Sequence, residues 1–351
     1  MPPHFAISMN VYLDNGYLNF TAIRKQGFPF NIIWGGRAVG KTYGALKDII
    51  ENNIRFMFMR RTQTQLEMIS KDEFSPFKPL NRDHGWDIRM KALSKHNYGV
   101  YNVAYVDGVE SFGDPVGYCC ALSTISNLRG FDASDVDVLI YDEFIPEPHA
   151  RPIKAEGEAF LNAYETINRN RELNGKPPLQ VFCLANANAL DNPLFIELGI
   201  VTKADSMVSK KQLYSRNEAR GLMLVNVCDS PISDQKSNTA LYKLTGNTQF
   251  SRMSLSNEFI GEAERGNIGS KPVKEYKPLV CIGELCVYKH KSRDEFYIST
   301  MVSGNPPRYG VGDTERARFR GRYMFLWSAH LNRRVYFEER ICEILLTRYF
   351  M

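Results

Sequence analysis

The chain has 351 residues, 44% of them hydrophobic and 24% charged, and this balance is typical of a globular protein large enough for two domains. No apolar run approaches the roughly 20 residues that cross a bilayer, and Met1-Pro2-Pro3-His4 does not begin a secretory signal. We therefore expect no membrane partner. The net charge of the chain is modest, at +5.

The first 205 residues alternate between segments typical of strands and segments typical of helices. Expected strands are residues 30–34, 54–59, 136–141 and 179–184, expected helices are residues 43–52 and 157–172, and Asp107-Gly108 marks a hairpin turn within residues 98–111. This alternation favours an α/β domain with a mainly parallel sheet and flanking helices on both faces.

The composition changes after about residue 205. Residues 229–257 are rich in Ser, Asn and Thr, which is typical of a connecting segment. Residues 279–289 and 295–302 alternate and predict an antiparallel hairpin, and residues 334–350 have apolar positions at helical spacing. We expect an α/β domain at 1–205, a linker region at 206–250 and a smaller C-terminal α+β domain at 251–351.

Seven cysteines are scattered along the chain. Cys281 and Cys286 are five residues apart and Cys119 and Cys120 are adjacent, and neither arrangement has the spacing of a zinc site. We expect reduced thiols in the core of a cytosolic protein.

The segment from Gly35 to Thr42 matches the phosphate-loop pattern G-x-x-x-x-G-K-T, with an expected strand before it and an expected helix after it. Its glycines let successive backbone N–H groups point inward and form an anion cradle at a helix N-terminus. Lys41 supplies a positive charge for the β- and γ-phosphates of ATP, and Thr42 offers a hydroxyl to Mg²⁺. The expected nucleotide-binding residues of this loop are Gly35, Gly36, Arg37, Ala38, Val39, Gly40, Lys41 and Thr42.

A second motif follows the apolar strand at residues 136–141, which ends in Asp142 and Glu143. A phosphate loop needs a carboxylate on the magnesium side, and Asp142 is expected to take this Walker-B role. Glu143 can orient and polarise the attacking water, so the pair predicts ATP hydrolysis.

Two further positions have candidate roles at the nucleotide. Asn186, at the end of the strand over 179–184, could bond the γ-phosphate or the water as a sensor, or could simply form a turn. An arginine near the end of the helix over 157–172, Arg169 or Arg171, could reach a neighbouring subunit's γ-phosphate in a ring ATPase. A solvated arginine that favours the helix dipole is the alternative.

Five blocks occur in the same order as in the genome-packaging ATPases of phi29-like bacteriophages, and the chain resembles a full-length member of that family. The blocks are Gly35–Thr42, Tyr141–Ile145, Arg169–Glu172, Cys183–Asn186 and Met253–Gly261. The first four fit several ring ATPases, whereas the fifth block and the basic, aromatic end of the chain narrow the resemblance.

The resemblance implies a P-loop ATPase domain of the additional-strand catalytic-glutamate (ASCE) type and a C-terminal RNase H-like domain that has lost nuclease activity. It implies a homomeric, pentameric ring on the portal vertex of a prohead, in the host cytoplasm, that translocates double-stranded DNA at the expense of ATP with Mg²⁺. A structural packaging RNA is a further implied partner. By the same resemblance Arg169 becomes the trans-acting arginine finger, with Arg171 as its rival.

Candidate nucleic-acid contacts lie in two places. From Arg308 to Arg334 there are seven arginines and only two acidic residues, and arginine suits phosphate because its planar fork donates two hydrogen bonds at once. A solvated face is the alternative. Because a translocase contacts phosphates rather than bases, Lys91, Lys95 and His96 are candidates for gripping DNA. The rival functions are a nuclease-bearing large terminase, a ring helicase and a non-enzymatic nucleotide-gated scaffold.

Overall fold

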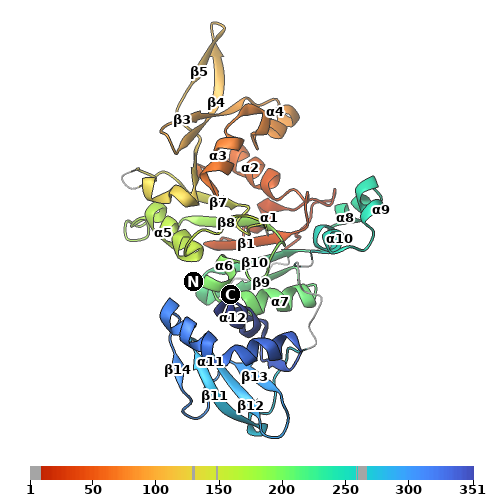
Figure 1. Cartoon of the computed structure of the whole chain (residues 1–351). Coiled ribbons are helices and arrows are strands. Elements are labelled where there is room, and N and C mark those ends of the chain that lie inside the picture. Colours follow the sequence, from red (N-terminus) through yellow and green to blue (C-terminus); the bar gives the residue numbers. More distant parts are fainter. Residues whose placement is uncertain (1–8, 129–130, 148, 258, 260–266) are drawn as a thin grey trace. The chain divides into compact units, whose positions relative to one another are not determined.

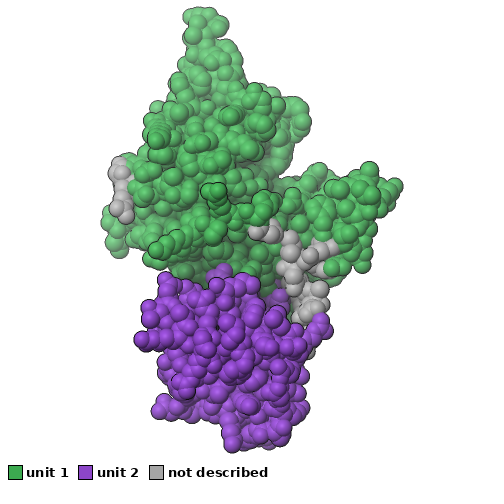
Figure 2. Space-filling model, viewed as in Figure 1, with its two compact units in different colours: residues 1–198, 206–260 green, residues 199–205, 261–351 purple. Residues whose placement is uncertain are grey.

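The structure is a computed structural model that describes residues 9–128, 131–147, 149–257, 259 and 267–351. It divides into two compact units, residues 1–198 with 206–260 and residues 199–205 with 261–351 (Figure 2). Among the described residues, no helix is long and apolar enough to cross a membrane.

The first unit is built on a mixed ten-stranded sheet whose central strands, from β6 to β10, are all parallel. In spatial order the strands are β3 (Ile88–Ala92), β4 (Tyr98–Val106), β6 (Gly117–Ala121), β2 (Phe56–Arg60), β7 (Val138–Asp142), β8 (Gln180–Asn186), β1 (Phe30–Gly35), β10 (Leu222–Val227) and β9 (Tyr214–Asn217), and β5 (Val109–Phe112) pairs with β4. The central strands are near-continuous apolar runs because both of their faces are buried.

Helices surround this sheet (Figure 1). The helices of the first unit are α1 (Phe20–Arg24), α2 (Lys41–Glu51), α3 (Gln63–Ile69), α4 (Lys78–His84), α5 (Glu156–Asn168), α6 (Pro193–Glu197), α8 (Pro231–Ser237), α9 (Ala240–Thr245) and α10 (Gln249–Ser251). Helix α7 (Val201–Ser209) begins among the residues of the second unit and ends among those of the first. Helix α2 places Leu46 and Ile49 on its buried face, where they join Ile33, Phe58 and Phe182 in one core.

Strand order determines where the nucleotide loop lies. β8 lies between β1 and β7, so the carboxyl ends of these three parallel strands are neighbours. The phosphate loop follows β1, Asp142 ends β7 and Asn186 ends β8. Polar side chains that are far apart in the sequence therefore meet at one edge of the sheet.

Most elements expected in the first 205 residues are confirmed, including the hairpin of β4 and β5 around Asp107-Gly108. The helix expected to end at Glu172 stops at Asn168, because Arg169 takes a left-handed φ of 44° that cannot continue an α-helix.

The prediction of a linker region at 206–250 is wrong. β10 pairs with β1 along its whole length and β9 pairs with β10, so this part of the chain completes the sheet. Residues 229–257, expected to be a connecting segment, form α8, α9, α10 and a π-helical turn at Arg252–Ser256. Their polar composition reflects short, exposed helices rather than a lack of structure.

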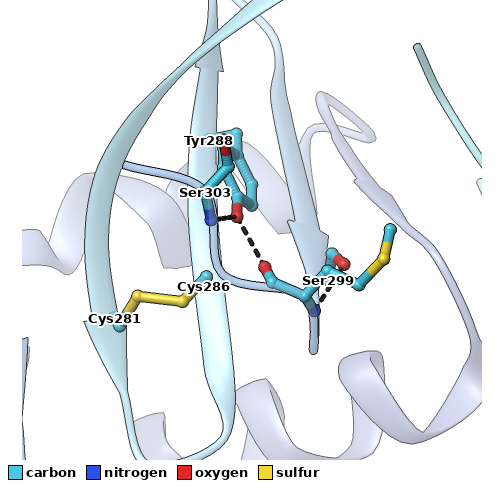
Figure 3. Close-up of a disulfide and its surroundings, with 6 residues drawn as sticks. Cys281, Cys286, Tyr288, Ser299 and Ser303 are labelled. Carbon is cyan, nitrogen blue, oxygen red and sulfur yellow. Dashed lines mark hydrogen bonds between the residues drawn. A yellow bond between two sulfur atoms is a disulfide. The ribbon is translucent and has the colours of Figure 1, made fainter. Parts of the chain in front are cut away.

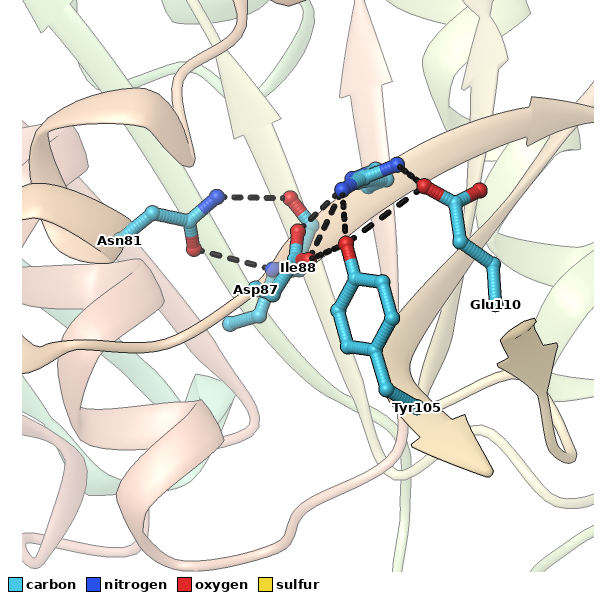
Figure 4. A network of polar contacts seen from close by, with 6 residues as sticks. Asn81, Asp87, Ile88, Tyr105 and Glu110 are labelled. Carbon is cyan, nitrogen blue, oxygen red and sulfur yellow. Dashed lines mark hydrogen bonds and ion pairs between the residues drawn. The ribbon is translucent and has the colours of Figure 1, made fainter. Parts of the chain in front are cut away.

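The hairpin of β4 and β5 extends away from the sheet as a ribbon (Figure 1). An ionic network joins β3 to this hairpin close to its turn: Arg89 of β3 bonds Asp87 and Glu110 at 2.7 Å each and Tyr105 Oη at 3.0 Å (Figure 4). Asn81 of α4 exchanges two 3.0 Å bonds with the Ile88 backbone beside the network.

The second unit has a five-stranded mixed sheet in the order β14 (Arg308–Tyr309), β11 (Tyr276–Ile282), β12 (Leu285–His290), β13 (Phe296–Ser299) and β15 (Val335–Phe337). Helices α11 (Asp313–Leu331) and α12 (Arg340–Phe350) cover its apolar face. The stretch expected as one strand at 279–289 is two strands that turn at Gly283, whose φ is 53°. The helix expected over 334–350 begins only at Arg340, after β15.

The prediction of reduced thiols is wrong for Cys281 and Cys286, which form a disulfide between β11 and β12 (Figure 3). The hairpin places the two residues directly opposite each other, with their Cα atoms 4.1 Å apart. The other five cysteines are free and buried. Beside the disulfide, Tyr288 Oη donates to the Met301 carbonyl at 2.5 Å and accepts from the Ser303 amide at 2.9 Å.

Candidate nucleotide site

The loop from Gly35 to Thr42 joins β1 to α2 with the backbone that its sequence pattern requires. Gly40 is the N-cap of α2 at a φ of 82°, a conformation that glycine adopts without strain. A Cβ on Gly36 would lie 2.5 Å from the Ser254 carbonyl oxygen, so only glycine fits there. The first amides of α2 have no partner within the helix and can therefore receive an anion, as the sequence pattern predicts.

Lys41 folds back over this loop. Its Nζ donates to the carbonyls of Gly36 at 2.7 Å and Gly35 at 3.2 Å, and to Asn186 Oδ1 at 3.1 Å. Burial lowers the pKa of Lys41 to about 7, with smaller contributions from the charges of Lys236 and Arg37 and an opposing one from Asp142. The buried ammonium therefore lacks an anion of sufficient charge beside it, and a polyphosphate would supply one.

Thr42 and Asp142 are brought together across the sheet: the Thr42 hydroxyl donates to Asp142 Oδ1 at 2.9 Å. Asp142 is 4% exposed. A hydroxyl and a carboxylate are hard oxygen donors, and Mg²⁺ typically takes one or two such protein ligands and completes its shell with water and phosphate. The chemistry of this pair therefore fits the expected magnesium site.

Glu143 follows directly, in a left-handed backbone conformation with a φ of 58°. For a non-glycine residue this conformation is costly, and such residues cluster at functional sites. Arg60, the last residue of β2, donates to Asp142 Oδ2 at 2.6 Å and to Glu143 Oε2 at 2.5 Å. Partial burial raises the pKa of Glu143, and the Arg60 charge opposes that rise.

A cavity of about 300 Å³ lies beside these groups, and its lining includes Arg60, Glu143 and Asn186. Asn186 therefore faces the same space as Glu143 while it also contacts Lys41. Arg37 of the loop pairs with Glu147, which also lines the cavity, at 3.0 Å. The cavity provides room for a water molecule next to Glu143.

The two candidate finger arginines have different environments. Arg171 is 5% exposed and donates to Asp137 Oδ1 at 2.7 Å and to the Val136 carbonyl at 2.6 Å. Arg169 has a side chain 44% exposed and donates to the backbone carbonyl of Phe131. Since Val136 and Asp137 precede β7, the end of α5 lies at the edge of the sheet opposite the phosphate loop.

Arg61, next to Arg60, also lines the cavity beside Glu143. It is buried and pairs with Glu156, with Nε and Oε1 2.6 Å apart, so it joins the end of β2 to α5.

The candidates for DNA contact lie apart from the nucleotide loop. Lys91 and Lys95 are exposed at the β3–β4 turn, at the outer edge of the sheet, and His96 is partly buried there.

Three contacts of the phosphate loop were not predicted from the sequence. Tyr17 lies against Gly40, the Lys236 ammonium donates to the Arg37 carbonyl, and Ser254 packs on Gly36. The block Met253–Gly261 was a signal for the last of these, although Glu258, Ile260 and Gly261 lie outside the described residues. Nothing in the sequence around Lys236 indicated its contact.

Residues 15–282 match the sequence model of the family described as podovirus DNA encapsidation protein (Gp16). The chain is 26% identical over 240 residues to the DNA packaging protein of Bacillus phage B103 and 25% identical over 240 residues to that of Bacillus phage phi29, each covering 67% of this chain. The matches span 65% and 63% of these relatives, less than two thirds of their length.

Two solved structures have a similar fold. The phi-28 gp11 DNA packaging motor matches with a TM-score of 0.62 at 20% identity, over 96% of this chain and 97% of that one. The bacteriophage phi-29 viral genome packaging motor assembly matches with a TM-score of 0.60 at 18% identity, over 95% of this chain and 99% of that one. At these identities the matches show a shared fold.

Proposed function

The chain belongs to the podovirus DNA encapsidation protein (Gp16) family, and we propose that it is an ATP-driven motor subunit that moves double-stranded viral DNA into a preformed capsid. The observation that carries the proposal is the hydrogen bond between Thr42 and Asp142, with Glu143 directly after it. This contact joins the phosphate loop to the carboxylate pair of a hydrolase.

In this proposal the loop from Gly35 to Thr42 holds the ATP phosphates, with Lys41 donating to their oxygens in place of the Gly35 and Gly36 carbonyls. Thr42 and Asp142 would hold Mg²⁺, which neutralises phosphate charge when bound. Asn186 bonds Lys41 in the structure and takes the sensor role. The position of β8 between β1 and β7 supports the ASCE type of ATPase.

Glu143 is the proposed group that orients the attacking water. For this the carboxylate must accept a hydrogen bond from water. Arg60 bonds Oε2 in the structure, and a carboxylate has a second oxygen, so Oε1 can accept from a water in the cavity while the Arg60 bond is in place.

Arg169 is the proposed trans-acting finger. It lies at the ends of the strands opposite its own phosphate loop, so its position is unsuited to the nucleotide of its own subunit and compatible with the proposed role in trans. Arg171 has its donors occupied by Val136, Asp137 and Pro177 and serves to close α5 onto the sheet. A trans finger requires a homomeric ring, and the ring proposed is a pentamer.

The second unit is the proposed contact for the portal vertex of the prohead and for a packaging RNA. Arg318, Arg320 and Arg322 lie on α11, and Arg318 has a side chain 70% exposed. The RNase H-like relationship stays a prediction, supported by an α+β sheet with helices on one face. The described residues contain no group of three or more His, Cys, Asp or Glu placed to hold a metal ion.

The test of the hydrolase is a comparison of Glu143→Gln with the parent chain. Replacement of the carboxylate by an amide removes the acceptor for the water but leaves the phosphate loop intact, so ATP should still bind while turnover falls by about 10²–10⁴-fold. Glu147→Gln, at the same cavity, is the matched control and should retain most turnover. Equal turnover by Glu143→Gln and the parent would contradict the assignment.

A further inference from the structure

A second lysine, Lys236 of α8, contacts the phosphate loop in addition to Lys41. Its ammonium donates to the backbone carbonyl of Arg37. Lys41 donates in the same manner to the carbonyls of Gly35 and Gly36. Two ammonium groups from distant parts of the chain therefore donate to carbonyl groups of the same loop. The amide groups of that loop are oriented as in an anion-binding site.

Helix α8 is fixed beside the loop. At its start, the Ser230 hydroxyl donates to the Gly16 carbonyl at 2.6 Å. The turn that contains Gly16 is itself bound to the loop, since the Leu18 amide donates to the Val39 carbonyl at 3.0 Å. The Lys236 side chain therefore extends from a helix that the Ser230 hydroxyl and the turn at Gly16 hold next to the loop, so the position of the helix does not depend on the Lys236 contact alone.

The charges around the loop favour an added anion. Arg37, Lys41 and Lys236 are three cations in or against one short loop, where they repel one another, and the Lys41 and Lys236 ammonium groups donate there to uncharged oxygens. A polyphosphate would relieve this repulsion. An ammonium that donates to a neutral carbonyl also gains a stronger hydrogen bond when the acceptor is a charged phosphate oxygen.

We propose that Lys236 is a second phosphate-binding lysine of the nucleotide site, which exchanges the Arg37 carbonyl for the phosphate oxygens of bound ATP. The proposal rests on the proposed ATPase function and adds a residue to its binding site. Because ATP has one phosphate more than ADP, Lys236 favours ATP over ADP. Through this contact, the helices at 231–256 would respond to which nucleotide is bound.

The test is the affinity of the full chain for ATP and for ADP, each with Mg²⁺, in Lys236→Ala and Lys236→Arg. Loss of one charge-assisted hydrogen bond should weaken ATP binding about tenfold and ADP binding by less, and Lys236→Arg should restore most of the loss. Lys243→Ala removes an exposed lysine from the neighbouring helix α9 and should change neither affinity.

Two results would overturn the proposal. One is an ATP affinity of Lys236→Ala within about twofold of the parent. The other is an equal loss for ATP and ADP that Lys236→Arg does not restore, because that pattern belongs to a structural role. Lys236→Ala could unfold at a lower temperature than the parent chain in the absence of nucleotide. In that case Lys236→Met is used in place of Lys236→Ala, because methionine keeps most of the length of the side chain that packs near Tyr242.

A parallel measurement on Lys41→Ala separates this inference from the proposed function. If Lys41→Ala binds ATP as tightly as the parent, the phosphate-loop assignment itself fails. If Lys41→Ala loses ATP while Lys236→Ala retains it, only the role of Lys236 fails.

Discussion

Arg60 and Glu143 form an ion pair at the ends of two neighbouring parallel strands, with Nη2 and Oε2 2.5 Å apart. Arg60 is directly opposite Asp142 in the register of β2 and β7, and its Nη1 lies 2.6 Å from Asp142 Oδ2. One guanidinium therefore holds both the proposed magnesium-side carboxylate and the proposed water-orienting carboxylate. Sheet register brings Arg60 and Asp142 together, and Glu143 follows directly after the strand in its left-handed conformation.

Arg60→Ala should move the acid limb of ATP turnover to higher pH. Burial raises the pKa of Glu143 and the Arg60 charge opposes that rise, so removal of the charge raises the pKa further. Glu143 must be ionised to accept a hydrogen bond from water. As the pH is lowered, Arg60→Ala should therefore lose activity at a higher pH than the parent chain does.

The measurement for Arg60 is the pH dependence of turnover. Arg55→Ala is the control. It removes the Arg55–Asp135 pair, a contact of 2.7 Å at the other end of β2, and should leave the acid limb unchanged. An acid limb in Arg60→Ala that coincides with that of the parent would show that the ion pair does not tune Glu143.

ATP binding should take up a proton at pH 8 and little at pH 6. The pKa of Lys41 is lowered to about 7, so at pH 8 the empty site holds mostly the neutral amine, whereas at pH 6 it already holds the ammonium. Bound phosphate stabilises the ammonium and raises its pKa again. Calorimetry in buffers of different ionisation enthalpy measures the uptake.

The control for proton uptake is Lys41→Arg, because a guanidinium stays charged at both pH values. This variant should bind ATP at pH 8 without the uptake. Absence of uptake by the parent chain at pH 8 would mean that Lys41 is already charged in the empty site.

Glu156→Ala should lower the free energy of unfolding by about 3–5 kcal/mol, because it leaves Arg61 buried without its partner. Both side chains of this pair are at most 5% exposed. Asp135→Ala breaks the exposed pair with Arg55 and should cost at most about 1 kcal/mol. Urea unfolding of the full chain compares the two, and equal losses would argue against a structural role for Arg61.

A mixture of Arg169→Ala and Lys41→Ala subunits should recover part of the ATP turnover that each lacks alone. In a ring, some interfaces then pair an intact phosphate loop with an intact Arg169 from the neighbour. The measurement is turnover against mixing ratio at constant total protein. A mixture no more active than its parts would place the finger elsewhere. Arg171→Ala should instead destabilise the chain, because Arg171 is buried with its donors occupied.

The arrangement of the proposed nucleotide site could be predicted from the sequence because its parts follow from local rules. A G-x-x-x-x-G-K-T loop between a strand and a helix, and two acids at the end of an apolar strand, each mark their own position. Parallel strand ends share one edge of the sheet, so Lys41, Thr42, Asp142 and Asn186 were expected near one another and are in contact.

The parts that were missed depend on long-range packing. No local pattern indicates that β10 pairs with β1 or that Lys236 reaches Arg37 from almost 200 residues away. Helix α11 was also missed, although its buried residues Phe319, Tyr323, Leu326 and Ala329 have helical spacing, because the interleaved arginines suggested a charged surface. The Cys281–Cys286 disulfide was missed because both residues were expected on one strand. In the structure they lie opposite each other on the two strands of a hairpin.

The most direct test of the motor is protection of double-stranded DNA from nuclease by empty proheads of the same phage, with the parent chain or Glu143→Gln and with or without ATP. The account predicts protected full-length DNA only with the parent chain and ATP, and no protection with Glu143→Gln although that variant still binds ATP. Equal protection by Glu143→Gln, or protection by the parent without ATP, would contradict a motor driven by hydrolysis at this site.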